Sequence, residues 1–268
     1  LFYARSEADR DWGLEVEASV RPRVEFLQGR AFHVRGRRSL FFHWNPGITA
    51  RLSTGDFDVV VVPGWSMPSS LAAVRTCRRH GIPYVVFSET NALTPRAAWR
   101  RLAKGPVVRW VVGGAAAWLA TGTASAEYLA AHGADPGRTF RFANTPDVDA
   151  LAAAVDAERP RRTAVRAELG IPPDVPLAIH VGRLIGAKDV GRLLDAHARA
   201  VASGSALWTL VVGDGAEAES LRARCRDRSI GRVTFAGARR PAELPALWAA
   251  ADVFVLASVH EPWGVVVN

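Results

Sequence analysis

The sequence predicts an α/β protein of two domains, each built around a parallel sheet. Short apolar runs that end at Gly or Pro alternate with stretches of helical periodicity over most of the chain. A strand, a helix and a second strand joined by short turns form a βαβ unit, in which the strands are parallel and the crossover is right-handed. At 268 residues the chain is long enough to bury two modest cores.

The first predicted domain spans residues 1–150 and becomes regular only after residue 56. Before that point, short apolar pieces are separated by Gly and Arg, and residues 43–47 predict a turn. The expected strands then span 57–62, 84–87, 118–121 and 139–142. The expected helices span 68–80, 95–112 and a stretch that begins after the N-cap Ser125 and ends near Gly133. Gly81 is the expected stop of the helix over 68–80.

A change of composition predicts the domain boundary, because residues 151–175 combine several prolines with a charged stretch and are expected to form a linker. The second predicted domain spans 176–268 and repeats the strand-then-helix order. Its expected strands span 177–181, 208–212, 233–235 and 253–256, with a helix after each of the first three. The run over 253–256 is continuously apolar, which is typical of a strand buried on both faces of a parallel sheet.

The net charge of +8 raises the question of nucleic-acid binding. The basic pairs are scattered over many elements and form no stripe with interleaved aromatics, so no nucleic-acid partner is predicted. The basic, Trp-bearing helix over 95–112 is expected to pack on its sheet, with contact to a membrane surface as the alternative. No run of about 18 apolar residues and no leader are seen, and the two cysteines, Cys77 and Cys225, are far apart, as expected of thiols in a reducing compartment. We therefore expect a cytoplasmic protein, with peripheral attachment to the inner membrane face left open; no zinc-ligand spacing is present.

Three strand ends in the second domain carry the residues with chemical character. They are Gly182-Arg183 with Lys188 five residues later, Gly213-Asp214-Gly215, and Glu261-Pro262-Trp263-Gly264. Open α/β sheets bind ligands outside the carboxyl ends of their strands, so these residues are expected to share one crevice. A guanidinium and an ammonium at that place suit a diphosphate, and the carboxylate suits the hydroxyls of a sugar. Gly264 allows a backbone N–H to approach a ligand closely.

These blocks, together with the run over 249–256, resemble the family 4 (group 1) glycosyltransferases in order and spacing. The resemblance covers the whole C-terminal half, while the N-terminal half is similar in architecture and in its exit over residues 144–149. It implies the GT-B fold, in which two Rossmann-like domains face a cleft. It also implies truncation at both ends: the first strand with its Gly-rich loop is missing, and the C-terminal domain ends one position before the family's second Glu.

The resemblance implies transfer of a sugar from a UDP- or GDP-linked donor to a glycan, lipid-linked or small-molecule acceptor, with retention of configuration and with no cofactor or bound metal. By position, the catalytic residues are Arg183, Lys188 and Glu261. The donor-binding residues are Gly182, Gly213, Gly237, Gly264 and Val265. Many relatives place a His after the second strand of the first βαβ unit. Here that strand is followed by Ser88 and Glu89, which become the acceptor-side candidates together with His43.

Two other functions remain as alternatives. A sugar-nucleotide epimerase on the same fold would need acid/base residues that the sequence does not present, and a non-catalytic module could bind a nucleotide-sugar or a glycan. A dinucleotide dehydrogenase is disfavoured, since Gly-x-Gly-x-x-Gly never follows a strand. His180 and His197 are expected to lie in the core, His260 is next to the site in sequence, and the oligomeric state is left open.

Overall fold

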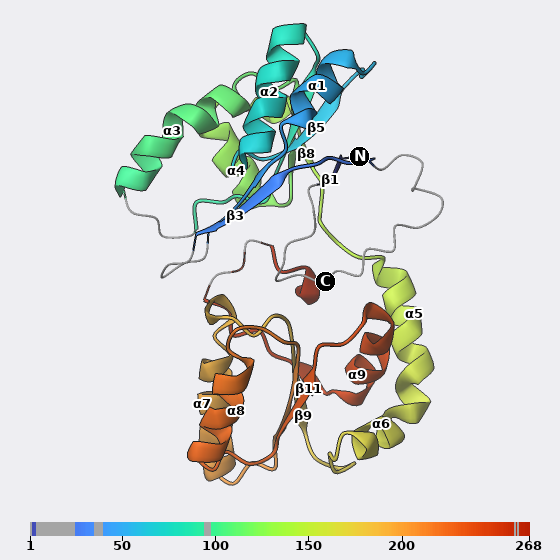
Figure 1. Ribbon diagram of the computed structural model, residues 1–268. Helices are drawn as coiled ribbons and strands as arrows, with labels where there is room; N and C mark the ends of the chain where they lie inside the picture. The colour runs from blue at the N-terminus through green and yellow to red at the C-terminus, as the bar shows by residue number, and fades with distance from the viewer. Residues whose placement is uncertain (1, 4–24, 35–39, 94–97, 260, 262) are drawn as a thin grey trace. The chain divides into compact units, whose positions relative to one another are not determined.

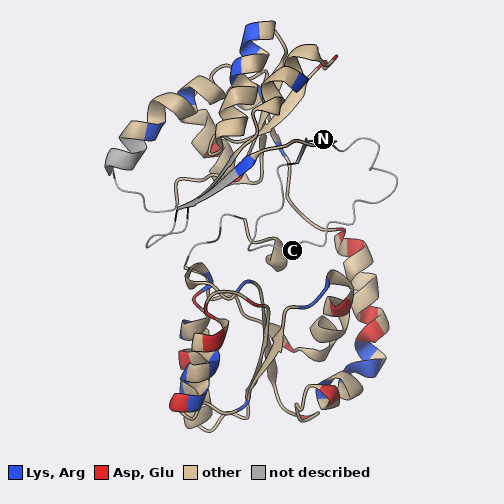
Figure 2. Cartoon of the chain, viewed as in Figure 1, with Lys and Arg blue, Asp and Glu red and all other residues tan. Residues whose placement is uncertain are grey.

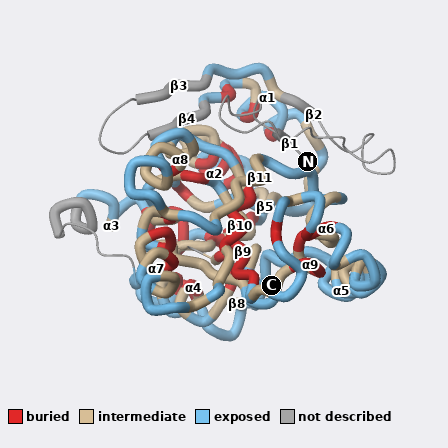
Figure 3. The backbone as a smooth tube through the Cα atoms, turned by 90° about the horizontal axis from the view of Figure 1, so that it is seen from below, coloured by how far each residue is buried: buried red, intermediate tan, exposed pale blue. Residues whose placement is uncertain are grey.

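The computed structural model describes residues 2–3, 25–34, 40–93, 98–259, 261 and 263–268. It divides into two compact units, Leu1–Ala143 and Asn144–Asn268, and each is an α/β unit with a four-stranded parallel sheet (Figure 1). In both units the buried residues concentrate on the strands and on the helix faces that cover them (Figure 3). The two predicted parallel sheets are confirmed.

The first unit contains a small hairpin and the first parallel sheet. Its strands are β1 (Phe2–Tyr3), β2 (Glu25–Phe26), β3 (Arg30–Val34), β4 (Leu40–Trp44), β5 (Val60–Pro63), β6 (Tyr84–Ser88), β7 (Ala117–Ala120) and β8 (Thr139–Arg141). Its helices are α1 (Gly47–Thr54), α2 (Pro68–His80), α3 (Ala98–Val112), α4 (Thr123–Ala130) and the short η2 (Pro136–Arg138). The sheet order is β5-β6-β7-β8. Helix α2 has the predicted bounds, because Pro68 fits the first turn and Gly81 takes the left-handed conformation that ends it, with φ 69°.

Three expectations for the first unit were wrong in detail. Residues 43 and 44 end β4, which pairs antiparallel with β3, so the predicted turn begins only at Asn45. Ser125 lies inside α4 and does not cap it; its hydroxyl instead donates to the Ser88 carbonyl oxygen at 2.7 Å. The strand expected over 57–62 spans Val60–Pro63 instead, and because β5 is outermost in its sheet, Val61 is 56% exposed. Part of the helix predicted over 95–112 lies outside the described residues.

The second unit follows the predicted order of strands and helices. Its strands are β9 (Leu177–Val181), β10 (Trp208–Val212), β11 (Val233–Gly237) and β12 (Val253–Phe254). Its helices are α5 (Val148–Glu158), α6 (Arg162–Glu168), α7 (Val190–Ala202), α8 (Ala218–Asp227) and α9 (Leu244–Ala250), with the short η3 (Arg159–Arg161), η4 (Gly186–Lys188), η5 (Pro241–Glu243) and η6 (Val265–Val267). All four strands are parallel, in the order β11-β10-β9-β12.

Helices cover both faces of the second sheet, which is why its central strands are buried and mostly apolar. Helices α7 and α8 lie on one face, and α5, α6 and α9 lie on the other (Figure 1). Strand β10 shows the alternation: Leu210 and Val212 pack with α6 and α9, while Val211 packs with α7 and α8. Strands β9 and β10 therefore form the rigid centre of this unit.

Two expectations for the second unit need correction. The predicted linker over 151–175 holds most of α5 and all of α6, and the boundary between the units falls earlier, after Ala143. Residues 151–175 are rich in charge because α5 and α6 pack on α9 with one face and expose the other to water. Strand β12 is shorter than the apolar run over 253–256, and Val253 is 51% exposed because β12 is the edge strand of the described sheet.

A buried arginine joins α6 to the start of β12. The Arg166 side chain is 2% exposed and donates to the carbonyl oxygens of Ala250, Pro173 and Val175 at 2.9, 2.6 and 2.8 Å. It also donates to Asp252 Oδ2 at 2.8 Å. The same carboxylate oxygen accepts the N–H of the first residue of β9 at 2.8 Å. One carboxylate thereby fixes the positions of β9, α6 and the start of β12.

Charge is distributed differently over the helices of the two units (Figure 2). Helices α2 and α3 carry Arg, Lys and His and contain no acidic residue, whereas α5 carries only acidic charges and α6 to α8 mix both signs. In the part of the chain that the structure describes, no helix combines the length and the apolar character needed to cross a bilayer.

Candidate functional site

The carboxyl end of β9 carries the first group of predicted site residues. β9 is buried over its first four residues, and the chain then turns through Gly182 and Arg183 into Leu184, which is fully buried. The Gly182 N–H donates to the Val212 carbonyl oxygen at 3.0 Å, so this turn continues the pairing of β9 with β10. Arg183 is exposed at the strand end, and Lys188 closes η4 directly before α7.

Glycines allow two strand-end loops to pack backbone against backbone. Gly213 and Gly215 have φ values of 139° and 155°. A Cβ atom on Gly213 would lie 1.8 Å from the Gly182 carbonyl oxygen, and one on Gly215 would lie 2.5 Å from the Leu184 carbonyl oxygen. The Gly213 N–H donates to the Gly237 carbonyl oxygen at 2.8 Å. The structure therefore brings the predicted glycines 182, 213 and 237 together at one edge of the sheet.

Lys188 and Glu261, 73 residues apart, form an ion pair between Nζ and Oε2. The Ser258 hydroxyl donates to the same Oε2 at 3.1 Å, and the Val259 N–H donates to the Ala187 carbonyl oxygen at 3.0 Å. The Lys188 and Glu261 side chains are 15% and 23% exposed. The predicted cation and carboxylate thus occupy one half-buried place, and a backbone hydrogen bond holds their two segments side by side.

The loop after Glu261 takes the conformation that its glycine permits. Gly264 is buried with φ 73°, and a Cβ atom there would lie 2.8 Å from Glu261 Cγ. A single short turn, η6, follows and begins at the exposed Val265. The Trp263 indole N–H donates to the Asn144 carbonyl oxygen at 2.5 Å, so this loop binds the first residue of the second unit.

The acceptor-side candidates all belong to the first unit. Ser88 is buried at the end of β6, where its hydroxyl accepts the Thr90 N–H at 3.1 Å and its carbonyl oxygen accepts the Ser125 hydroxyl. These bonds give Ser88 a structural role in its loop. Glu89 is half-buried directly after it. His43 lies in β4, and its side chain is outside the described residues.

His180 and His197 are both buried, as predicted. His197 is satisfied at both ring nitrogens, by Thr209 Oγ1 at 2.9 Å and by the Gly231 carbonyl oxygen at 2.9 Å. The Nδ1 atom of His180 lies 3.2 Å from the Val255 carbonyl oxygen, and its Nε2 atom has no hydrogen-bond partner among the described residues. Burial lowers the pKa of His180, with a smaller contribution from the charge of Lys188. His260 lies outside the described residues.

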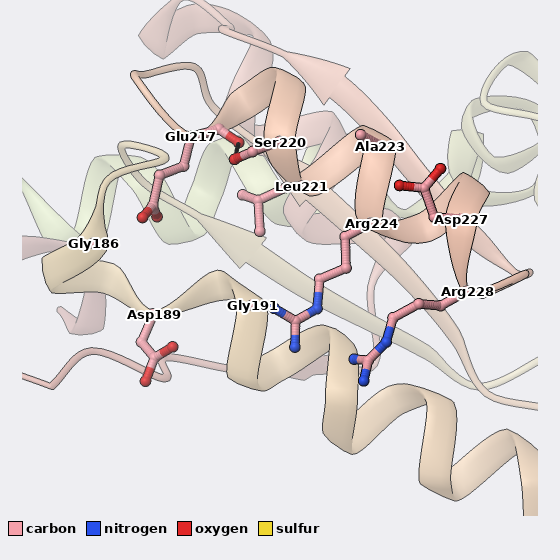
Figure 4. A pocket seen from close by; sticks show the side chains of 10 residues that line it. All are labelled: Gly186, Asp189, Gly191, Glu217, Ser220, Leu221, Ala223, Arg224, Asp227 and Arg228. Carbon is pink, nitrogen blue, oxygen red and sulfur yellow. Dashed lines mark hydrogen bonds between the residues drawn. The ribbon is translucent and has the colours of Figure 1, made fainter.

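A pocket of about 590 Å³ opens in the second unit between the start of α7 and α8 (Figure 4). Glu217 and Asp189 line one part of it, and Arg224 extends from α8 toward Gly191. The Arg224 guanidinium is paired with both Asp195 oxygens at 2.6 Å. None of the predicted catalytic residues lines this pocket, so it lies beside the candidate site and is not part of it.

Sequence reasoning did not assign roles to Ser258, His180 or the Trp263–Asn144 hydrogen bond. A hydroxyl three residues before Glu261 was a visible signal for the first. The other two have no signal in the sequence, because each depends on a contact across a long stretch of chain. Among the described residues, no cluster of three or more His, Cys, Asp or Glu side chains could hold a metal ion.

Sequence comparisons identify families for both parts of the chain. Residues 3–145 match the family described as glycosyl transferase 4-like domain, and residues 161–268 match glycosyl transferases group 1. The lipopolysaccharide core biosynthesis glycosyltransferase LpsE of Rhizobium meliloti is 42% identical over 103 residues, which are 38% of this chain and 28% of LpsE. The GDP-mannose-dependent alpha-mannosyltransferase of Mycobacterium tuberculosis is 31% identical over 211 residues, which are 73% of this chain and 48% of that enzyme.

Solved structures agree with this result at the level of the fold. Anabaena Alr3699/HepE in complex with UDP superposes with a TM-score of 0.65 and 19% identity, over 88% of this chain and 61% of that one. The α,α-trehalose 6-phosphate synthase of Burkholderia multivorans gives a TM-score of 0.63 and 12% identity, over 82% and 55%. The chain thus spans about a quarter to a half of the two curated relatives and about 60% of these structures. The fold is GT-B, and the chain belongs to the group 1 glycosyl transferases of family 4.

Proposed function

We propose that the second unit binds a nucleotide-sugar linked to UDP or GDP, and that the protein transfers the sugar to a glycan, lipid-linked or small-molecule acceptor with retention of configuration. One observation carries this proposal: Lys188 and Glu261, distant in sequence, meet at the carboxyl edge of the second sheet beside Gly182. A cation and a carboxylate side by side match a ligand that joins an anionic diphosphate to a polyhydroxylated ring.

The chemistry of such a transfer fits these groups. Cleavage of the glycosidic bond builds negative charge on the β-phosphate, and cations already in place stabilise that charge more in the transition state than in the ground state. We assign this role to Arg183 and Lys188. Glu261 accepts hydrogen bonds from sugar hydroxyls, and the backbone of Gly264 and Val265 approaches the donor. Since the chain supplies its own cations here, no bound divalent metal is proposed.

The names of the relatives support the donor class. HepE has been solved with UDP and with UDP-glucose, and the mycobacterial relative is a GDP-mannose-dependent enzyme. The relative from Rhizobium acts in lipopolysaccharide core biosynthesis, which supports a glycan or lipid-linked acceptor. On the acceptor side we propose Glu89 in preference to Ser88, because Ser88 is 3% exposed whereas Glu89 is only half-buried.

Lys188→Ala and Arg183→Ala test the proposal. Each should lower the rate of sugar transfer by about 10²–10³-fold, because each removes a group that stabilises the leaving phosphate. The measurement is release of UDP or GDP from UDP-glucose and GDP-mannose in the presence of EDTA, with circular dichroism to show that the fold is kept. Arg226→Ala, which removes a cation 63% exposed on α8, is the matched control and should change nothing.

Transfer at the wild-type rate in both variants would contradict the assignment of the site, and loss of activity in EDTA would contradict metal-free catalysis. Two further outcomes identify the alternatives. Tight binding of a nucleotide-sugar without transfer to any acceptor indicates a binding module. A change in the sugar while it stays on the nucleotide indicates an epimerase.

We further propose that α3 gives the protein a peripheral contact with an anionic membrane surface. Val107 and Trp110 are 39% and 38% exposed on a helix without acidic residues, and Arg78 lies 5.4 Å over the Trp110 ring. Each Lys or Arg near such a surface contributes about 1 kcal/mol. The protein should sediment with phosphatidylglycerol vesicles at low salt and be released at high salt. Equal sedimentation with neutral phosphatidylcholine vesicles, or none with either, would rule the contact out.

A further inference from the structure

His180 is a buried histidine with only one of its two ring nitrogens bonded. It is the fourth residue of β9 and is fully buried. Its Nδ1 atom faces the Val255 carbonyl oxygen at 3.2 Å, and the Val255 N–H donates to the Ile179 carbonyl oxygen at 2.9 Å. A carbonyl oxygen can only accept, so Nδ1 carries the proton in this contact. In the neutral ring, Nε2 is then a bare acceptor.

This bare acceptor is costly in its present surroundings. Buried polar atoms are nearly always hydrogen-bonded, and one without a partner loses the hydration it had in the unfolded chain. No described residue donates to Nε2. The other buried histidine of this unit, His197, has both nitrogens bonded, so the local fold is able to satisfy an imidazole fully. An unpaired Nε2 therefore points to a donor that arrives in another state of the site.

The geometry identifies that donor. The position that a Cβ atom would take on Gly182 lies 3.5 Å from His180 Nε2 and 4.0 Å from Lys188 Cε. The imidazole edge and the end of the lysine chain therefore border the same small space, which is open because residue 182 has no side chain. The Lys188 ammonium is one bond beyond Cε and now binds Glu261 Oε2, which it shares with the Ser258 hydroxyl.

We propose that His180 is a positioning residue for Lys188. When the nucleotide binds, its diphosphate competes with Glu261 for the ammonium, which frees Oε2 for the sugar hydroxyls of a full donor. The ammonium has three N–H donors, which the diphosphate and His180 Nε2 share in the bound state. His180 thus offers a neutral acceptor that holds the cation beside the phosphate and away from the carboxylate. This inference rests on the proposed donor site and adds the group that sets the lysine within it.

Three substitutions at position 180 test the roles of the two ring nitrogens independently. The amide of Asn reaches the Nδ1 position, so His180→Asn keeps a donor for the Val255 carbonyl and loses the acceptor. The amide of Gln reaches the Nε2 position, so His180→Gln keeps the acceptor and loses the Val255 bond. His180→Leu loses both. The measurements are the Kd of UDP and of GDP by titration calorimetry and the midpoint of thermal unfolding.

We expect nucleotide affinity to fall in the Asn variant and thermal stability to fall in the Gln variant. His180→Asn should bind the nucleotide about 10- to 100-fold more weakly, the usual effect of losing one charge-assisted hydrogen bond, with a midpoint near that of the wild type. His180→Gln should bind within about threefold of the wild type and unfold at a lower temperature. His197→Asn is the matched control, expected to lower the midpoint and leave the Kd unchanged. A purely structural role for His180 would make affinity follow stability in every variant.

Gly182→Ala tests the shared space from the other side. The added methyl group fits without a clash but fills the gap between the imidazole and the lysine, so nucleotide binding should weaken about tenfold or more while the fold is kept. Gly231→Ala is its control, because a Cβ atom there meets no atom within 4 Å.

The outcomes distinguish this inference from the proposed function. If the wild type binds neither UDP nor GDP, the donor site itself is wrong and the inference falls with it. If the wild type binds and His180→Asn and His180→Leu bind equally well, only the role of His180 is overturned. Imidazole ¹⁵N NMR of the free wild-type protein should show the proton on Nδ1, and a proton on Nε2 would also overturn it.

Discussion

At the scale of single residues, the site depends on a few positions where a side chain is either indispensable or forbidden. Gly213 is of the second kind, because a methyl group there would overlap the Gly182 carbonyl oxygen at 1.8 Å. His180 is of the first kind, since its ring connects β9 to the segment that leads to Ser258 and Glu261. The sequence predicted that both belong near the site or in the core. It did not reveal what either one touches.

The depressed pKa of His180 has a consequence for stability. Burial, and to a lesser degree the Lys188 charge, hold this pKa below the ordinary value of 6.5, so the unfolded chain binds more protons than the folded one between the two values. The free energy of unfolding should therefore fall as the pH drops below about 6.5. Urea unfolding at pH 7.5 and pH 5.5 measures this fall, and His180→Gln should reduce it. An unchanged pH dependence in that variant would show that other groups cause the loss.

At the scale of elements, α6 depends on its arginines. Burial on its own would raise the pKa of Asp252, but hydrogen bonds from the Leu177 N–H, Arg162 and Arg166 outweigh it and bring the pKa below its usual value. The Asp252 side chain is 43% exposed, so water weakens the ion pair, and the carbonyl contacts of Arg166 carry most of the stabilisation. This cluster fixes β12 at the start of the segment that reaches Glu261.

Arg166→Ala should lower the free energy of unfolding by about 3 kcal/mol, because it removes the donor from the buried Ala250 carbonyl oxygen, from two part-buried carbonyl oxygens and from a carboxylate. Arg161→Ala is the matched control on the neighbouring turn, where the side chain is 58% exposed, and should cost less than about 0.5 kcal/mol. Chemical denaturation of both variants makes the comparison. Equal losses would mean that the buried contacts of Arg166 contribute little.

Periodicity predicted the elements well where helices and strands are regular. Strands β9 and β10 and helix α2 have the bounds expected from the sequence. The prediction of a buried strand over 253–256 failed for β12. An apolar run indicates that a segment prefers burial, but it does not show whether the strand lies at the centre or at the edge of its sheet. The prediction of a linker over residues 151–175 also failed, because prolines and charged residues are typical both of linkers and of helices on the surface. The sequence predicted that Lys188 and Glu261 lie in the same crevice. It did not predict their ion pair, because no sequence pattern links residues so far apart.

At the scale of the whole molecule, each unit has a core made of its own residues. The buried cluster of the first unit ends at Ala134, and those of the second unit begin at Val165. Charge differs between the units as well, since α2 and α3 of the first are basic while α6 to α8 of the second mix both signs. This organisation indicates that the second unit does not need the first to complete its core.

Residues 144–268 alone should therefore fold cooperatively. A sigmoidal thermal transition in circular dichroism and dispersed amide signals in NMR are expected, because both faces of the second sheet are covered from within this segment. A broad, non-cooperative transition would show that the first unit contributes to its stability.

The hydrogen bond from the Trp263 indole to the Asn144 carbonyl oxygen also matters for engineering. A graft that replaces the loop over 261–268 with that of a relative would exchange only one end of this bond. Residue 144 is 119 positions away and would be left behind by any cassette cut from the C-terminal end alone. Successful chimeras should therefore carry both segments from the same parent.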